Sequence, residues 1–225
     1  HMQSSISRPI GAVRLTDRFV KSDPISTRDF KALKQAITQQ FDDVPWLSQH
    51  GGMLGGVGGT IRALAEIDQK LRNHPIDRVH GHYLSVSRVN ELLELFRGLT
   101  IKQREDLPGL SRDRADLILA GTAILAEVMR RGQFTQLMIC GQGLREGLFF
   151  EHFMRGSSPI IPDIRSFSVM NLARMYHYEA IHSAKVRELA LSMFDQLYPM
   201  HGYGAWAREL LGHASILHDI GNAVN

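Results

Sequence analysis

Two glycine-rich stretches contain residues whose types and spacing suit the binding of phosphate. The first, residues 51–60, has four glycines within five positions and ends in Thr60. Glycine lets the backbone adopt positive φ and approach a ligand closely. A helix that starts at such a turn points free N–H groups and its positive dipole end at the same place. We expect Gly58, Gly59 and Thr60 to hold a phosphate group, with Arg62 adding a charge. A purely structural turn is the alternative, because the spacing matches neither the Walker A pattern nor the dinucleotide fingerprint.

The second stretch, residues 141–147, follows the apolar segment 136–140. Glycine turns that follow buried strands lie at the carboxyl ends of those strands, which is where α/β sheets bind ligands. Arg14, Arg62, Arg114 and Arg145 each lie on or just after a turn beside a glycine or a capping residue, where a guanidinium can donate two parallel hydrogen bonds to phosphate oxygens. Of these, we expect Arg62, Arg114 and Arg145 to contact an anion. For each of them, a surface ion pair with a neighbouring carboxylate is the alternative.

A third group of polar residues lies near the C-terminal end and could bind a divalent metal. His182 and the adjacent His218 and Asp219 fall on two expected helices. Imidazole together with carboxylate is a suitable ligand set for a divalent transition metal. The alternative is a hydrogen-bonded core histidine and a polar helix end.

Other reactive side chains give weaker signals. His80 and His82 flank a glycine in an expected turn with no acidic residue or cysteine beside them, so we expect a structural role. The chain has no Gly-x-Ser-x-Gly elbow for a nucleophilic serine. Cys140 falls in an apolar segment, which favours a buried core thiol over a nucleophile.

The hydrophobic pattern predicts the elements that position these residues, as strands alternating with helices over the first two thirds of the chain. Helix N-caps are expected at Ser26, at Ser85 or Ser87, and at Ser111. Expected strands are 10–16, the segment before Gly58, and 136–140. Expected helices are 27–37, 60–67, 89–96, 112–131, 148–154, 167–173, 182–197 and 205–217.

The composition indicates a globular protein. Its 225 residues are 44% hydrophobic and 22% charged, enough for one large domain or two smaller ones. No apolar run approaches the roughly 18 residues of a membrane span, and the net charge of +3 comes without a long basic run. We therefore expect neither membrane nor nucleic-acid partners. A single cysteine excludes a disulfide within the chain and favours a cytoplasmic location.

Four segments occur in an order that is similar to a known enzyme family: residues 11–16, 56–64, 108–116 and 143–147. Together they resemble the exopolyphosphatase/guanosine-pentaphosphate phosphatase (Ppx/GppA) family, and the resemblance covers nearly the whole chain. The tail, with His182 and residues 217–221, resembles the helical HD-type domain that longer members carry.

The resemblance implies an α/β fold, namely the second lobe of an actin-like (ribonuclease H-like) ATPase fold followed by an all-α HD-like helical segment. We divide the chain accordingly into an expression-tag remnant and N-terminal arm (1–6), lobe II (7–155), a linker (156–166) and a partial HD-like domain (167–225). The first lobe, which carries the acidic residues that position water and metal in this family, is expected to precede the chain. The helical domain is expected to lengthen the polyphosphate-binding surface and to dimerise.

The family hydrolyses phosphoanhydride bonds with an activated water and Mg²⁺. The resemblance therefore implies a phosphatase acting on inorganic polyphosphate or guanosine pentaphosphate. It places Gly58, Gly59 and Thr60 at the cleft and makes Arg114 an anion contact, with Arg145 at the hinge between lobes. We expect this fragment to be inactive and the full-length protein to be a homodimer. The alternatives are a polyanion-binding module without catalysis, and an HD-type metal phosphohydrolase.

Overall fold

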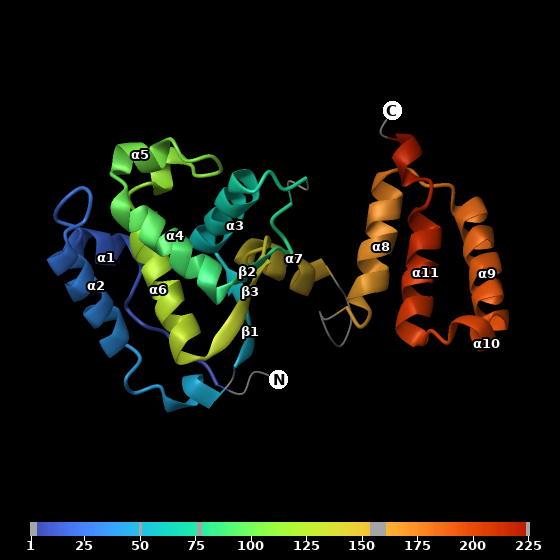
Figure 1. Ribbon diagram of the computed structural model, residues 1–225, viewed down its shortest axis with the longest axis horizontal. Helices are drawn as coiled ribbons and strands as arrows, with labels where there is room; N and C mark the ends of the chain where they lie inside the picture. Colours follow the sequence, from blue (N-terminus) through green and yellow to red (C-terminus); the bar gives the residue numbers. More distant parts are fainter. Residues whose placement is uncertain (1–3, 50, 76–77, 154–160, 224–225) are drawn as a thin grey trace. The chain divides into compact units, whose positions relative to one another are not determined.

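Figure 1 shows the computed structural model of the chain, which describes residues 4–49, 51–75, 78–153 and 161–223. The chain divides into two compact units, His1–Phe149 and Phe150–Asn225. The first unit combines helices with a small sheet, and the described part of the second unit is helical. Residues 156–160 of the expected linker lie outside the described residues.

A three-stranded sheet forms the centre of the first unit. Its strands lie in the order β1 (Gly52–Val57), β3 (Phe134–Cys140), β2 (Tyr83–Ser85). β1 runs parallel to β3 with Val57 opposite Cys140, whereas β2 runs antiparallel to β3 with Tyr83 opposite Met138. The carboxyl ends of β1 and β3 and the beginning of β2 therefore meet at one edge of the sheet. We call this the carboxyl edge.

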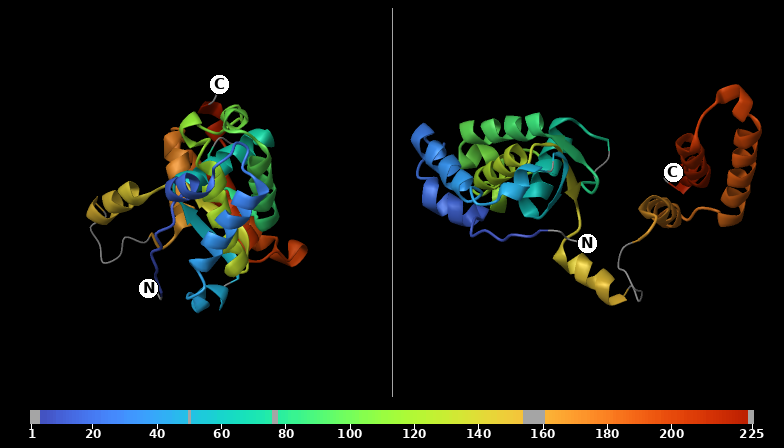
Figure 2. Two further views of the ribbon diagram at one scale, coloured as in Figure 1. Left: turned by 90° about the vertical axis from the view of Figure 1, so that its left-hand side faces the viewer. Right: turned by 90° about the horizontal axis from the view of Figure 1, so that it is seen from below.

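Three helices pack on the sheet: α3 (Gly59–Leu71), α4 (Val86–Gly98) and α6 (Ile118–Arg131). α4 and α6 run side by side (Figures 1 and 2). The buried strand residues Leu84, Leu137 and Ile139 share one hydrophobic core with these helices. On β1, Met53 and Val57 point away from that core and are 51% and 60% exposed.

The remaining elements of the first unit pack around α6 or connect its parts. α1 (Ala12–Phe19) and α2 (Thr27–Gln39) contact α6. The short elements are η1 (Pro45–Gln49), α5 (Ile101–Glu105) and η2 (Arg112–Arg114), and α7 (Leu144–Phe153) spans the division between the units.

The described part of the second unit contains α8 (Ile164–Met175), α9 (Ala180–Gln196), α10 (Tyr198–His201), α11 (Ala205–Leu217) and η3 (Ile220–Ala223). α11 packs against both α8 and α9. Gly212 allows a close approach to α9, because a Cβ there would lie 3.3 Å from Arg187 Nε and 3.6 Å from a Leu191 methyl carbon. Across the described residues of the whole chain, every helix falls short of the length or apolar character that a membrane span requires.

Local capping signals in the sequence predicted two helix starts correctly. Ser26 Oγ accepts a hydrogen bond from Asp29 N–H, and Ser85 Oγ accepts one from Arg88 N–H, both at 3.1 Å. The expected strand 136–140 is confirmed as most of β3. The strand before Gly58 is confirmed as β1, and the helix after it begins at Gly59, one residue before Thr60.

The expected strand 10–16 is wrong, because these residues enter α1. Leu15 and Phe19 follow each other at i, i+4, and a short apolar segment fits helical and strand spacing equally well.

The expected helix 112–131 is interrupted between η2 and α6. The buried Arg104 guanidinium donates to the Ala115 carbonyl at 2.7 Å, at the place where the helix is interrupted. Ser111 makes no side-chain cap, and Cys140 is half-buried rather than buried.

Candidate functional site

The turn between β1 and α3 is a single residue long. Gly58 forms it with φ of +117° and is the N-cap of α3. Side chains other than glycine rarely adopt this conformation, so the sharp turn depends on Gly58. The first-turn N–H groups of α3 and the positive end of its dipole therefore lie at the carboxyl edge. The first turn of α3 contains no acidic residue that would neutralise this end.

The Arg114 guanidinium packs directly on this turn. A Cβ at Gly59 would lie 2.6 Å from Arg114 Cζ and 2.7 Å from Nη2, so any other side chain there would displace the guanidinium from this position. Arg114 comes from η2, more than 50 residues away in the sequence, and is half-buried. A fixed positive charge beside the positive end of a helix is unfavourable by itself, whereas an anion bound between them would be stabilised by both.

Two further contacts hold η2 in this position. Gly109 has φ of +87°, and a Cβ there would lie 2.6 Å from the Glu66 carbonyl, so the loop before η2 touches the backbone of α3. The fully buried Arg104 binds the Ala115 carbonyl at 2.7 Å and the Leu99 carbonyl at 3.3 Å. Burial lowers the pKa of Arg104, while the nearby carboxylate of Asp23 acts in the opposite direction. Arg104 was not among the functional residues predicted from the sequence.

The other predicted phosphate-binding residues are oriented differently. The Thr60 side chain lies against α6, because a Cβ at Gly121 would meet its Cγ2 at 2.7 Å. Thr60 can therefore offer an anion its backbone N–H more readily than its hydroxyl group. Arg62 and Arg145 both lie close enough to Glu146 to influence its ionisation.

Glu146 is the carboxylate that accompanies the second glycine turn. Its Oε2 accepts a hydrogen bond from Gly143 N–H at 2.7 Å. Hydrogen bonds from the backbone N–H groups of Glu146 and Gly143 hold the pKa of this carboxyl below its usual value, with smaller contributions from the charges of Arg145 and Arg62. Glu146 is therefore a weak proton acceptor, and it partly neutralises the two arginines.

A buried carboxylate binds His82, one of the two histidines that precede β2. Asp68 of α3 is 2% exposed, and its oxygens contact His82 Nε2 at 3.0 Å, Arg88 Nε at 2.6 Å and Arg72 Nε at 3.0 Å. We expected no acidic partner for these histidines, and for His82 that was wrong. The partner comes from the preceding helix, so proximity in the sequence did not reveal it. His80 Nδ1 lies 3.1 Å from Gly141 N–H, which donates to it.

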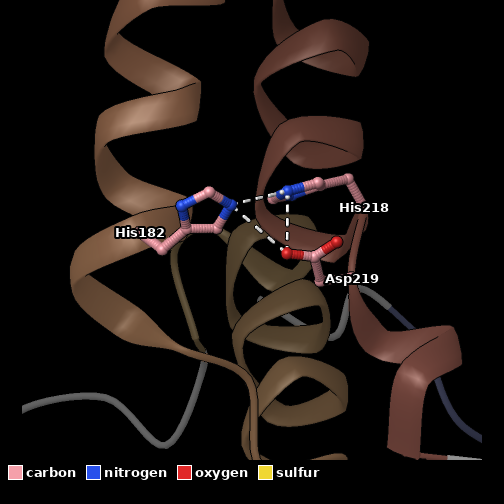
Figure 3. Close-up of side chains that lie close together, drawn as sticks. All are labelled: His182, His218 and Asp219. Atoms are coloured by element: carbon pink, nitrogen blue, oxygen red, sulfur yellow. Dashed lines mark hydrogen bonds and ion pairs between the residues drawn. The ribbon is translucent and has the colours of Figure 1, made fainter.

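In the second unit, His182, His218 and Asp219 come together as a cluster of three side chains (Figure 3). His182 Nε2 lies 3.1 Å from His218 Nε2 and 3.3 Å from Asp219 Oδ2, and His218 Nε2 lies 3.0 Å from the same carboxylate oxygen. His182 is in the first turn of α9, and the other two residues follow α11.

A backbone contact prepares one of these imidazoles for a cation. His218 Nδ1 lies 2.8 Å from the Ser215 carbonyl. A carbonyl only accepts, so Nδ1 donates to it, and Nε2 of His218 is left facing the cluster, where it can bind a cation once it has no proton. Two nitrogens and a carboxylate oxygen within 4.8 Å of one another form part of a coordination shell. This mixture suits Zn²⁺, Mn²⁺ or Fe²⁺ better than Mg²⁺, which prefers oxygen ligands.

Both parts of the chain match models of one protein family. Residues 1–155 match the Ppx/GppA phosphatase family, and residues 164–225 match Ppx/GppA phosphatase, domain III. The first match covers well over half of the chain.

Solved structures agree with these matches. A crystal structure of the Aquifex aeolicus member of the Ppx/GppA family is 27% identical, with a TM-score of 0.58 over 68% of this chain and 49% of that chain. The type II variant of the Aquifex aeolicus Ppx/GppA phosphatase is 26% identical, with a TM-score of 0.59 over 66% of this chain and 49% of that one.

An exopolyphosphatase from Cytophaga hutchinsonii ATCC 33406 shares the fold at 21% identity, with a TM-score of 0.62 over 68% of this chain and 50% of that chain. The chain thus spans about half the length of these relatives. The predicted fold class, an actin-like α/β lobe followed by a helical segment, is confirmed. With a family match over 155 of its 225 residues, the chain belongs to the Ppx/GppA phosphatase family.

Proposed function

We propose that residues 7–155 bind the phosphate groups of inorganic polyphosphate or guanosine pentaphosphate and form one side of an active site that hydrolyses their terminal phosphoanhydride bonds. The observation that carries this proposal is the Arg114 guanidinium packed on Gly59 at the start of α3. The contact brings a charged fork and free backbone N–H groups to one point, as a phosphate group requires. The exopolyphosphatase relative has the same fold and supports the choice of substrate class.

The residues at the carboxyl edge bind phosphate and stabilise its negative charge, and they do not break the phosphoanhydride bond themselves. Backbone N–H groups of Gly59 and Thr60 and the Arg114 guanidinium hold one phosphate group in a fixed place. They also stabilise the negative charge that develops on its oxygens during phosphoryl transfer. Arg62 and Arg145 lengthen the positive surface beside this group.

Magnesium does not fit this set of donors. The predicted phosphate contacts are N–H groups and guanidinium groups, which repel a cation, and Mg²⁺ needs oxygen ligands. The carboxylate at the second turn, Glu146, already accepts from Gly143 N–H and is a weak base. We therefore assign no step to Mg²⁺ here. The residues of this chain bind the anion without completing its hydrolysis.

Titration calorimetry with tripolyphosphate at low salt tests the binding. We expect binding that weakens as the salt concentration rises, because exposed charges are screened. An absence of binding at low salt would contradict the proposal. Phosphate release from long-chain polyphosphate, measured in parallel with Mg²⁺ present, should stay at background. Substantial release would show that the chain completes the reaction.

A second candidate function rests on the cluster in the second unit. We also propose that His182, His218 and Asp219 bind a divalent transition metal and that residues 167–225 form a partial HD-like domain. Such a metal could activate a water molecule for phosphoester hydrolysis. Metal-free protein should then gain phosphatase activity on a model phosphoester when Mn²⁺ is added. If the protein binds Mn²⁺ but does not hydrolyse the model phosphoester, the site is structural rather than catalytic.

A further inference from the structure

The residues that precede β2 share the carboxyl edge with the phosphate-binding turn. Because β2 is antiparallel to β3, its beginning lies beside the end of β3. The Ile139 carbonyl accepts from Gly81 N–H at 2.9 Å, and Ile139 N–H donates to the His82 carbonyl at 2.9 Å. On the other side of β3, Val57 pairs with Cys140, so Gly58 follows at the same level. β3 therefore separates the two segments, and each lies one strand spacing from it.

The ring of His80 is held in a defined orientation. Gly141 N–H donates to Nδ1 at 3.1 Å, so Nδ1 is an acceptor and the proton of the neutral ring lies on Nε2. A Cβ at Gly141 would lie 3.0 Å from His80 Cβ, so the glycine permits this close contact. The side chain is exposed, and within the described part of the chain no residue is hydrogen-bonded to Nε2. Nε2–H is an available donor at the carboxyl edge.

The turn that carries His80 is fixed from α3 as well. Gly81 has φ of +80°, which reverses the chain between the two histidines. His82 is anchored to Asp68, a buried residue of the same helix whose N-terminus forms the phosphate-binding turn. α3 therefore positions both segments. Its N-terminus forms the phosphate-binding turn, and Asp68, further along the same helix, holds the turn that carries His80 and His82. His80 is preorganised relative to Gly58 and Gly59 before any substrate binds.

We propose that His80 Nε2–H donates a hydrogen bond to a second phosphate group of the substrate and so makes this site selective for phosphate chains over short phosphates. The inference rests on the proposed function, because it takes Gly59 and Arg114 as the site of the first phosphate group. Two strand spacings amount to about 10 Å, which is too far for one phosphate group to bridge. A chain of several phosphates could reach both positions.

Two substitutions distinguish the acceptor role of His80 Nδ1 from the donor role of His80 Nε2. In His80→Asn, the amide oxygen stands near the position of Nδ1 and can still accept from Gly141 N–H, whereas the outer donor is lost. In His80→Gln, the longer side chain carries an N–H donor near the position of Nε2. The measurement is calorimetric affinity for pyrophosphate and for long-chain polyphosphate, on the whole 225-residue chain.

We expect His80→Asn to bind long-chain polyphosphate about tenfold more weakly, which is typical for loss of a hydrogen bond to a charged group. Pyrophosphate affinity should be unchanged, and His80→Gln should retain most of the long-chain affinity. Equal long-chain affinity of wild type and His80→Asn overturns the inference and leaves the proposed function intact. Wild-type protein that binds neither ligand overturns the proposed function itself and the inference with it.

An independent measurement covers the case in which a variant does not fold. The ¹⁵N resonance of His80 Nε2 in the wild-type protein should shift when long-chain polyphosphate is added and should not shift with pyrophosphate. An unchanged resonance under saturating long-chain polyphosphate contradicts the inference without any substitution.

Discussion

Arg114 and Gly59 are in direct contact although one belongs to a short 3₁₀ helix and the other opens α3. A side chain at position 59 would occupy the space of the Arg114 guanidinium, with its Cβ 2.6 Å from Cζ. The guanidinium thus lies beside the N–H groups of the first turn of α3. Two positive features brought this close are most stable when an anion lies between them.

Replacing Arg114 by alanine should weaken binding of tripolyphosphate about tenfold or more, because a charge-assisted hydrogen bond is lost. Binding should also become less sensitive to salt. Arg112→Ala is the matched control, since Arg112 lies in the same short helix and is exposed. Equal losses in the two variants would mean that only general positive charge matters at this edge.

Gly59→Ala should weaken tripolyphosphate binding nearly as much as Arg114→Ala does, because the new methyl group displaces the guanidinium. Gly59 lies in a helix and alanine favours helices, so the free energy of unfolding should change by less than about 1 kcal/mol. Combining the two substitutions should add little, since both remove one contact. Gly98→Ala is the control, because a Cβ there meets nothing within 4 Å. Full affinity in Gly59→Ala would show that the contact with Arg114 does not matter for binding.

Features that depend on neighbours in the sequence could be predicted, and the helix caps show why. The hydroxyl groups of Ser26 and Ser85 bond to N–H groups three residues ahead, so the residue types themselves carry the signal. The strand–glycine–helix turn at Gly58 is equally local, and the structure has it within one residue of the expected position.

Contacts between distant segments could not be derived in the same way. The sequence marked Arg114 as beside a capping residue, but its packing on Gly59 depends on the buried Arg104 and on Gly109, whose loop touches α3. Asp68 is another example, because a carboxylate in an amphipathic helix gives no sign that three cationic or imidazole groups will surround it. Burial and pairing of charges are properties of the folded chain.

Replacing Asp219 by asparagine should weaken Zn²⁺ binding by more than about tenfold. Even substitution of a residue that only supports a metal ligand typically lowers metal affinity by about tenfold or more, and Asp219 is proposed as a ligand itself. His182→Ala should have at least the same effect. His213→Ala is the matched control, because His213 lies on α11 and bonds to Ser166 Oγ at 3.2 Å. The measurement is competition calorimetry against a chelator. Similar affinity in Asp219→Asn and in His213→Ala would mean that the cluster does not bind the metal.

Glu127 links α6 to α2 and should make stability depend on pH. Its carboxylate bonds to Arg130 at 2.7 and 2.8 Å and to Arg131 at 3.1 Å, and Arg131 also binds the Thr38 carbonyl. Partial burial raises the pKa of Glu127, but the hydrogen bonds from Arg130 and Arg131 outweigh it, and the pKa lies below the usual 4.5. The folded protein therefore holds this proton less tightly than the unfolded chain, and the stabilisation is present above pH 4.5. It is lost as the pH falls through the lowered pKa.

Glu127→Gln should therefore lower the free energy of unfolding at neutral pH by about 1 kcal/mol, as expected for a hydrogen-bonded group that loses its charge. The difference from wild type should shrink in acid, below the pKa of the folded protein. Urea unfolding at neutral and acidic pH measures both quantities. Glu94→Gln removes a comparable i, i+3 pair with Arg97, but Glu94 is 59% exposed, so it should change stability by less than about 0.5 kcal/mol at either pH. A Glu127→Gln difference that stays constant with pH would contradict the prediction, because the protonated acid would then stabilise the fold as much as the charged carboxylate does.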